Sequence, residues 1–434
     1  MDKVRKKNEK KQKRKSKTVI GSAHLMPLQF LAVLLTFCIV SSVLAQEKIT
    51  AIQGGDLYTI TSGIIHNGTI LIKDGKIWRI GQNIEIPKNA KVIDAKGKVI
   101  MPGLIAAVAN VAIAGYGSLD KIGDSLDPFH YSVSLALASG VTTAFVRSGG
   151  PSGENPLGGT NAVIKTTYGD LDGMLVKEPA VQAVEISNTQ WLRKTNFKQN
   201  LQKAQNYLHK LAEYQKTKGD KKVEEPKKPA GIDVYISLLR REMPAALSAA
   251  TADDILAALE LVDEFGIRMI LTGAVEGWIV AEEIAKRDVS VIITPREKRR
   301  PNEDSSAPSG STMENAAILK KAGVKFAIVP PSTAFTIWGG AGRDLMTLPI
   351  EAAFAVSGGL DEQTALEAIT ITAAEILGVA DRLGSLQVGK DADIIILDGH
   401  PFHYNTFVEF TLINGKVLYD KKQSTYFSHI THDN

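Results

Sequence analysis

Cysteine is almost absent from this sequence: among 434 residues, Cys38 is the only one. A single thiol excludes an intrachain disulfide framework and any site built from several thiolates. With 44% hydrophobic and 23% charged residues, the chain is globular rather than disordered. Its length suits a single α/β barrel with an accessory domain as well as two independent domains.

Positive charge is scarce outside the N-terminal region. Residues 1–17 contain ten of the 51 Lys and Arg residues, together with the two acids Asp2 and Glu9. Beyond residue 45 the chain carries 41 basic and 45 acidic residues. The body of the protein therefore lacks the basic surface of a nucleic-acid-binding protein, and no nucleic-acid partner is predicted.

The basic N-terminus precedes an uncharged apolar segment, residues 30–44, followed by Ala45. A basic region, a short apolar core and small residues at the cleavage point are typical of a secretory signal. We therefore predict a signal peptide over residues 1–45, cleaved before Gln46. The mature protein is then exported to the periplasm or the extracellular space and has no membrane contact. An uncleaved anchor is the alternative, but its apolar core is short for a full span.

Residues 99–110 read Val-Ile-Met-Pro-Gly-Leu-Ile-Ala-Ala-Val-Ala-Asn. This apolar stretch is interrupted only by Pro102 and Gly103, which indicates a buried parallel strand entered through a turn. Side chains two residues apart point to the same face of a strand. Val108 and Asn110 are therefore expected to point together into the mouth of a barrel, where barrel enzymes keep their sites.

Short strands with tight turns are predicted at both ends of the mature chain. They fill residues 48–101 and return in residues 391–419, with Asn67-Gly68, Asp74-Gly75 and Asn414-Gly415 as turn signals. Strand and helix patterns alternate between these two regions. This order predicts a small β-domain built from both ends of the chain beside a barrel.

The alternating region contains several helices and strands with recognisable ends. The predicted helices cover residues 128–140, 253–265, 277–286, 315–322, 344–356 and 362–377. The strands that follow residues 99–110 cover residues 141–146, 268–271, 289–294 and 325–329. Residues 216–228 are expected to form a charged linker and residues 296–312 a polar loop. The Gly-rich loop over residues 149–159 lacks the Gly-x-x-x-x-Gly-Lys-Ser/Thr pattern, so no phosphate-binding loop is predicted.

One helix carries an apolar stripe with alternating spacings of four and three residues. Its members are Phe197, Leu201, Ala204, Leu208 and Leu211. We interpret the stripe as a face packed on the protein's own barrel, and a partner-binding helix is the alternative.

Two segments carry a resemblance to a known family. Val92–Ile105 and Gly384–Asp393 are similar to the two end signatures of the amidohydrolase superfamily, in its imidazolonepropionase-like branch. The resemblance extends over about residues 49–419. It implies a (β/α)₈ TIM barrel over residues 102–382 with a metal-dependent hydrolase site at the C-terminal ends of its strands. Residues 46–101 and 383–420 are then a composite β-sandwich domain, and residues 421–434 a tail.

The same resemblance implies that the usual metal ligands have been replaced. The family reads Pro-Gly-Leu-Ile-Asp-x-His-x-His where this chain has residues 102–110, and further histidines and an aspartate follow on later strands. The positions that match these ligands are Val108, Asn110, Ser248, Gly273 and Pro331. If the alignment is shifted by one residue, Thr272 rather than Gly273 is the matching position. Valine offers no lone pair, and a neutral amide is a poor substitute for imidazole or carboxylate.

Other candidate ligands are few. The histidines are His24, His66, His130, His209, His400, His403, His429 and His432, and none ends a predicted barrel strand. Lys165 and Glu185 end plausible strands, and some relatives bridge metals with a carboxylated lysine or a glutamate. Pairing with a charged neighbour is the other interpretation of both residues. His400 and His403 lack a third ligand beside them, which favours a role as surface-loop residues.

Loss of the metal would remove both the activated water and the polarised carbonyl of the family mechanism. We therefore expect a catalytically degenerate homologue, with no cofactor and no catalytic residue, that binds a small ligand or a partner. The family suggests an active paralogue or a second copy of the chain as that partner. The alternative is an active enzyme that cleaves carbon–nitrogen bonds of cyclic amides or dipeptide-like substrates, with zinc or iron in an atypical site. A polysaccharide- or surface-binding structural protein is a third class, but no motif supports it.

Overall fold

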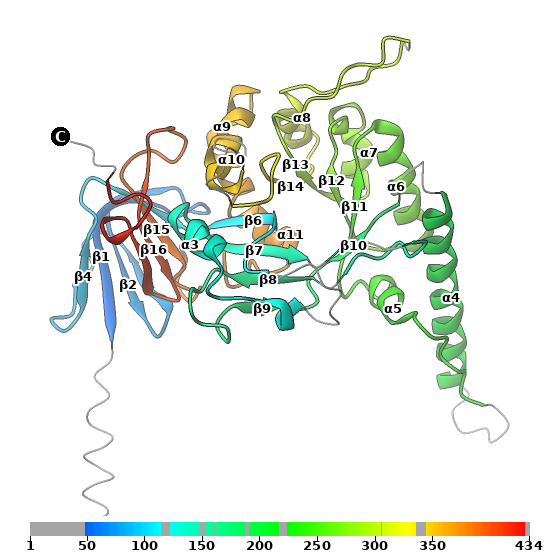
Figure 1. Ribbon diagram of the computed structural model, residues 1–434, viewed down its shortest axis with the longest axis horizontal. Coiled ribbons are helices and arrows are strands. Elements are labelled where there is room, and N and C mark those ends of the chain that lie inside the picture. Colours follow the sequence, from blue (N-terminus) through cyan, green and yellow to red (C-terminus); the bar gives the residue numbers. More distant parts are fainter. Residues whose placement is uncertain are drawn as a thin grey trace, which may run out of the picture. The chain divides into compact units, whose positions relative to one another are not determined.

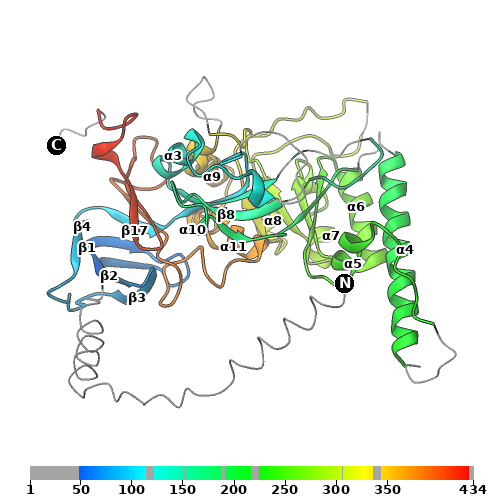
Figure 2. The same ribbon diagram turned by 60° about the horizontal axis from the view of Figure 1, so that its bottom comes forward.

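The computed structural model describes residues 48–113, 122–147, 149, 153–159, 161–186, 191–216, 224–304, 306–335 and 344–429 (Figures 1 and 2). The predicted signal peptide with Cys38, residues 217–223 of the predicted linker and residues 430–434 of the predicted tail lie outside these ranges. Within the described part, none of the helices combines the length and the apolar character that crossing a bilayer needs.

Strands from both ends of the mature chain form one eight-stranded sheet, which we call the composite sheet. Its order is β17-β16-β15-β5-β1-β2-β3, with β4 also paired to β1. The bounds are β1 Ile49–Tyr58, β2 Ile64–Lys73, β3 Lys76–Gly81, β4 Lys91–Asp94, β5 Val99–Pro102, β15 Ile394–Leu397, β16 Val408–Ile413 and β17 Lys416–Asp420. Antiparallel pairing of β5 with β15, which sets Met101 opposite Ile395, joins the two ends. The N- and C-terminal strands thus share one sheet, and the sandwich stays a prediction.

Two of the three predicted turns connect hairpins in this sheet. Asp74 and Gly75, with φ of 51° and 77°, link β2 to β3, and Asn414 and Gly415, with φ of 48° and 72°, link β16 to β17. The prediction of a turn at Asn67-Gly68 was wrong, because these residues lie inside β2 beside an irregularity in its pairing with β1. Glycine is required there because a Cβ at Gly68 would overlap the side chain of Leu57.

Two further sheets hold the central part of the chain. A four-stranded sheet contains β6 (Leu104–Ala109), β7 (Val141–Arg147), β8 (Asn161–Lys165) and β9 (Leu175–Lys177). A five-stranded, wholly parallel sheet contains β10 (Gln182–Val184), β11 (Ala245–Ala249), β12 (Met269–Gly273), β13 (Ser290–Ile293) and β14 (Phe326–Ile328). Gly103 separates β5 from β6, so the stretch predicted as one strand serves two sheets.

The direction of β8 departs from the predicted barrel alternation. β6 and β7 are parallel, as the predicted strand–helix–strand step requires, but β8 runs antiparallel to β7. The described part of the connection between them, residues 149 and 153–159, contains no helix of the kind that a parallel crossover usually has. Because of this reversal, Lys165 lies opposite Thr143, near the start of β7, whereas Arg147 lies at the other end beside Asn161.

The two central sheets share one core. Inward side chains of β6, β7, β8, β12, β13 and β14 form a single buried cluster that includes Ile105, Phe145, Val163, Ile270, Ile292 and Ala327. Within the described residues, the sheets meet through single bridges, Asn110 with Ala334 and Leu157 with Val184, rather than through continuous ladders. The described chain is therefore a mixed α/β structure.

Most helices lie where periodicity predicts them, with corrected ends, whereas the helix over Asp233–Leu239 was not predicted. Their bounds are α3 Tyr131–Ala138, α4 Trp191–Lys216, α5 Asp233–Leu239, α6 Ala252–Phe265, α7 Ala281–Lys286, α8 Asn315–Lys321, α9 Leu348–Ser357, α10 Glu362–Ala368 and α11 Ile371–Leu377. Short 3₁₀ turns are η1 Ile122–Ser125, η2 Gly277–Ile279, η3 Leu345–Thr347 and η4 Lys421–Gln423. The single helix predicted over residues 362–377 is two helices, because the Ile369 carbonyl accepts the N–H of Ile105 in β6 at 2.9 Å.

The apolar stripe of α4 packs against the protein's own chain. Phe197, Leu201 and Ala204 are fully buried in the main core. The Phe197 ring lies 5.7 Å from the ring of Tyr235 in α5. This packing agrees with the first of the two interpretations of the stripe.

Candidate functional site

The C-terminal ends of β7, β11 and β12 surround a cavity of about 150 Å³, which we call the mouth cavity. Its polar side chains are those of Arg147, Glu185, Ser248 and Thr272. Its apolar walls include Val108, Phe145, Ile270 and Ile292. Sites of α/β proteins form at this edge, because loops leave the carboxyl ends of parallel strands there.

Of the five positions that the sequence resemblance matches to family ligands, Val108 and Ser248 line this cavity. Ser248 pairs with Thr272 across β11 and β12, and both side chains face the cavity. Gly273 is not among the lining residues and has φ of 94°, so the alternative register through Thr272 matches the geometry.

Asn110 and Pro331 lie outside the lining of the mouth cavity. The Asn110 side chain is exposed, and its backbone N–H donates to the carbonyl oxygen of Thr333 at 2.7 Å. Pro331 is half-buried in the same segment, just after β14. The structure therefore brings these two positions near each other through the backbone, without placing either side chain in the cavity wall.

The charges at the cavity come from arginine and glutamate. Glu185, which follows β10, accepts a hydrogen bond at 3.1 Å from Arg193 of α4. Arg147 ends β7, and its guanidinium has no ion pair or side-chain hydrogen bond with any residue that the structure describes. Among the residues that line the cavity, Arg147 and Glu185 are the charged ones, and Glu185 already has Arg193 as its partner. Sequence reasoning missed Arg147, although a lone cation that ends an apolar strand just before a Gly-rich loop was a usable signal.

This set of donors does not fit a divalent cation. Val108 has no lone pair, and Ser248 and Thr272 offer neutral hydroxyl oxygens in place of imidazole or carboxylate. The positive charge of Arg147 would also oppose a cation in the same cavity. Across the described ranges, no three or more His, Cys, Asp or Glu side chains are arranged to hold a metal ion.

A loop on the same edge is anchored by two buried glutamates. The loop predicted over residues 296–312 follows β13, and a carboxylate oxygen of Glu276 accepts hydrogen bonds from Gly310 N–H at 2.7 Å and from Arg299 at 3.0 Å. Glu351 is fully buried and accepts one from Arg296 at 2.7 Å. These ion pairs between partly exposed arginines and buried carboxylates hold the loop beside the strand ends.

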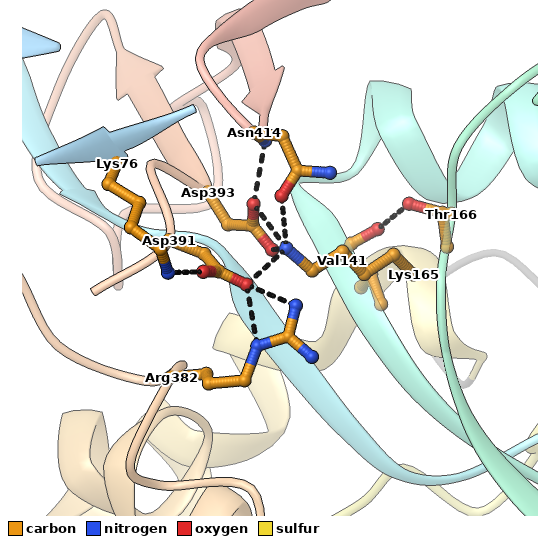
Figure 3. A network of polar contacts seen from close by, with 8 residues as sticks. All are labelled: Lys76, Val141, Lys165, Thr166, Arg382, Asp391, Asp393 and Asn414. Atoms are coloured by element: carbon orange, nitrogen blue, oxygen red, sulfur yellow. Dashed lines mark hydrogen bonds and ion pairs between the residues drawn. The ribbon is translucent and has the colours of Figure 1, made fainter. Parts of the chain in front are cut away.

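Lys165 lies in a different place, at the boundary between β8 and the composite sheet (Figure 3). Its Nζ is 2.8 Å from Asp391 Oδ2, 3.0 Å from Asp393 Oδ1 and 2.6 Å from Asn414 Oδ1. The side chain is only 1% exposed, so its ammonium group interacts with these three acceptors rather than with water. The structure does not bring Lys165 to the mouth cavity, whereas Glu185 lies in its wall.

The two aspartates of this cluster respond differently to their surroundings. Burial alone would raise the pKa of Asp391, but hydrogen bonds from Lys165, Lys76 and Arg382 outweigh it and lower the pKa to about 2. Burial raises the pKa of Asp393, even though Lys165 acts against the shift. The cluster is therefore a buried ionic network that connects β8, the segment before β15 and the turn after β16.

Comparison with known proteins shows a family match over part of the chain. Residues 267–419 match the model of the Amidohydrolase family. Two curated relatives are a 5'-deoxyadenosine deaminase from Methanosarcina acetivorans, 57% identical over 44 residues, and an imidazolonepropionase from Staphylococcus aureus, 40% identical over 52 residues. The first match covers 10% of each chain, and the second covers 12% of this chain and 13% of the relative. The matched segments thus span only about a tenth of these relatives.

A solved structure matches over a much larger part of the chain. An amidohydrolase from Thermotoga maritima aligns with a TM-score of 0.68 and 27% identity, over 86% of this chain and 100% of that one. Structural neighbours of this kind imply an α/β protein with a TIM-barrel fold. Residues 267–419 therefore match the Amidohydrolase family by sequence, and the fold of the larger part of the chain is similar to that of an amidohydrolase. This confirms the family inferred from the two end signatures, the second of which lies within the matched residues.

Proposed function

We propose that this protein is a catalytically degenerate amidohydrolase homologue whose mouth cavity binds a small carboxylate. One observation carries the proposal. Arg147 lines the same cavity as Val108, Ser248 and Thr272. The family resemblance matches Val108 and Ser248 to metal-ligand positions, and Thr272 as well in the alternative register. A site arranged for a cation in the family is, in this chain, arranged for an anion.

The geometry supports a compact anionic ligand. A guanidinium group binds a carboxylate through two parallel hydrogen bonds, and the hydroxyl groups of Ser248 and Thr272 can donate further ones. Phe145 and Ile270 offer apolar surface to the rest of the molecule. A cavity of about 150 Å³ equals the volume of roughly five water molecules. The ligand is therefore a small carboxylic acid with a short apolar or amide body.

Loss of hydrolysis follows from the same residues. The family reaction depends on a metal that activates water and polarises the carbonyl. Neither Ser248 nor Thr272 has a histidine in the cavity wall to serve as its base. Binding without turnover is the consequence.

We extend the proposal to location and partner. The N-terminal pattern over residues 1–45 supports export, with the mature chain beginning at Gln46. Family membership supports an active paralogue or a second copy of this chain as partner. N-terminal sequencing of the protein recovered from its producing cell tests the cleavage, and a mature chain that still begins at Met1 would contradict it.

Calorimetric titration of the purified protein with L-pyroglutamate and with N-acetylglycine tests the binding. We expect saturable binding of at least one compound, and weakening by about tenfold or more in Arg147→Gln, because a charge-assisted hydrogen bond contributes about 1.5–3 kcal/mol. Arg79→Gln, which removes a guanidinium that stacks on Trp78 away from the cavity, is the matched control. Absence of binding for both compounds, or equal affinities for the two variants, overturns the carboxylate site.

The alternative function is hydrolysis of the same compounds, which the family match supports. It predicts release of free glutamate or glycine that rises when zinc or iron is added. An assay for free primary amines, with the protein first treated with a chelator and then with each metal, separates the two functions. Metal-dependent turnover would establish the enzyme and end the degenerate interpretation.

A further inference from the structure

A second cavity lies outside the mouth and is larger, at about 390 Å³. One face of the composite sheet forms its floor, with Met101 of β5, Ile395 and Leu397 of β15 and Val408 of β16. The end of α3 closes one side, and α3 lies next to β16 (Figure 1). None of these residues belongs to the lining of the mouth cavity.

The remaining walls come from segments that are far apart in sequence. Met346 and Thr347 of η3 and Ile350 of α9 form one wall. The loop before β16 contributes Tyr404 and Phe407, and Phe427 after η4 contributes a further ring. Because several segments that are far apart in sequence meet around it, the space is concave rather than a flat apolar face. Its volume lies within the range of about 300–1,000 Å³ that holds small molecules.

The chemistry of the walls indicates which molecules fit. Aliphatic and aromatic side chains dominate, and the polar ones are Ser139, Asp344, Thr347, His403, Tyr404, Thr406 and Tyr419. Asp344 is fully buried, and its Oδ1 accepts the backbone N–H of Met346 at 3.1 Å. Thr347 and Thr406 already donate their hydroxyl hydrogens to backbone carbonyls, those of Asp344 and His400, at 2.9 and 2.7 Å. They have no second proton with which to recognise an anion. The Asp344 carboxylate in the wall also opposes an anion, so an uncharged, mainly apolar ligand fits this cavity better than an anionic one.

We propose that this second cavity is a binding site for a small, neutral aromatic or aliphatic compound, independent of the mouth. Phe427, from the C-terminal segment, is part of the wall of the cavity and does not fill it. The aromatic rings of Phe407 and Phe427 in the wall suit a flat ring system.

Titration of the full-length purified protein with N-phenyl-1-naphthylamine, a neutral dye that fluoresces in apolar surroundings, tests the site. We expect saturable binding with one dye per chain. Ile350→Trp fills the cavity and should weaken binding by tenfold or more, and Ala138→Leu at the end of α3 should weaken it less. Ser357→Trp, on an exposed position of the same helix, is the matched control and should leave the affinity unchanged.

The outcome also separates this site from the mouth. Arg147→Gln should leave dye binding unchanged, because Arg147 does not line the second cavity. Thermal unfolding of each variant shows whether it is folded, and Ala138→Leu provides a smaller change if Ile350→Trp fails to fold. Equal dye affinity in Ala138→Leu, Ile350→Trp and the wild type overturns the proposal, as does the absence of saturable binding in the wild type.

Discussion

Lys165 Nζ lies 2.8 Å from Asp391 Oδ2, although the two residues are 226 positions apart in sequence. Lys165 ends β8, and Asp391 stands just before β15, so this ion pair joins the composite sheet to the four-stranded sheet (Figure 3). Both side chains are almost completely buried, at 1% and 4% exposure. Removing either partner of such a buried pair leaves the other charge without compensation and destabilises the fold.

Replacing the lysine is expected to destabilise the protein strongly. Lys165→Met leaves Asp391 and Asp393 buried without their shared cation, a change that typically costs about 3–5 kcal/mol. Urea denaturation measures the loss. Lys198→Met removes a lysine from an exposed pair with Glu264 and should cost at most about 1 kcal/mol. A loss below that level for Lys165→Met would show that the network does not hold the two sheets together.

Acid should weaken the same contact. The folded pKa of Asp391 is about 2, below the value of about 3.9 expected in the unfolded chain. A lowered folded pKa adds stability above the unfolded pKa, and that stability is lost as the pH falls through the folded pKa. Above pH 5 the free energy of unfolding of the wild type should therefore be about 2 kcal/mol higher than that of Asp391→Asn. This difference should disappear between about pH 4 and pH 2. Unfolding curves across this range test it, and a constant difference would contradict the assigned pKa.

The features that the sequence predicted correctly depend on a few consecutive residues. Helix α6 begins after Thr251, whose hydroxyl accepts from the Asp254 N–H at 3.1 Å, and ends at Gly266 with φ of 65°. The Asp74-Gly75 turn needs two residues with positive φ, and an Asp-Gly pair is typical of such turns. Family membership was predictable for a similar reason, because each end signature is a continuous run of residues.

The features that were missed depend on pairing across the chain. Apolar residues in β8 give the same pattern in a parallel and in an antiparallel strand, so its reversal and the resulting place of Lys165 could not be read locally. A shift of one residue moves a side chain to the other face, which is why Thr272 rather than Gly273 faces the mouth cavity. The three acceptors around Lys165 come from residues more than 220 positions away.

The junction between β5 and β6 should tolerate no side chain at Gly103. A Cβ there would overlap the buried side chain of Thr142, and overpacking of a core typically costs about 1–3 kcal/mol. Thermal or urea unfolding of Gly103→Ala measures the effect. Gly123→Ala is the matched control, because the nearest atom to its Cβ is 3.5 Å away. If both variants had the same free energy of unfolding, the backbone at this junction would be able to shift and accommodate the added methyl group.

Two imidazoles placed on the cavity edges of β11 and β12 should create affinity for zinc. Ser248 and Thr272 are paired neighbours on parallel strands, about 4.8 Å apart, and both face the mouth cavity. Ser248→His combined with Thr272→His should bind zinc at least tenfold more tightly than either single variant, because two nitrogen ligands then act together. Competition with a coloured chelator measures the affinities.

The charge of Arg147 should limit that gain. Adding Arg147→Gln to the double-histidine variant removes a positive charge from the cavity and should tighten zinc binding further. Ser248→His combined with Gly273→His is the register control, since Gly273 does not line the cavity. Folding of that control is checked by circular dichroism, because a side chain at a φ of 94° is strained. If a folded Gly273→His control bound zinc as tightly as the Thr272→His pair, the assigned cavity face of β12 would be wrong.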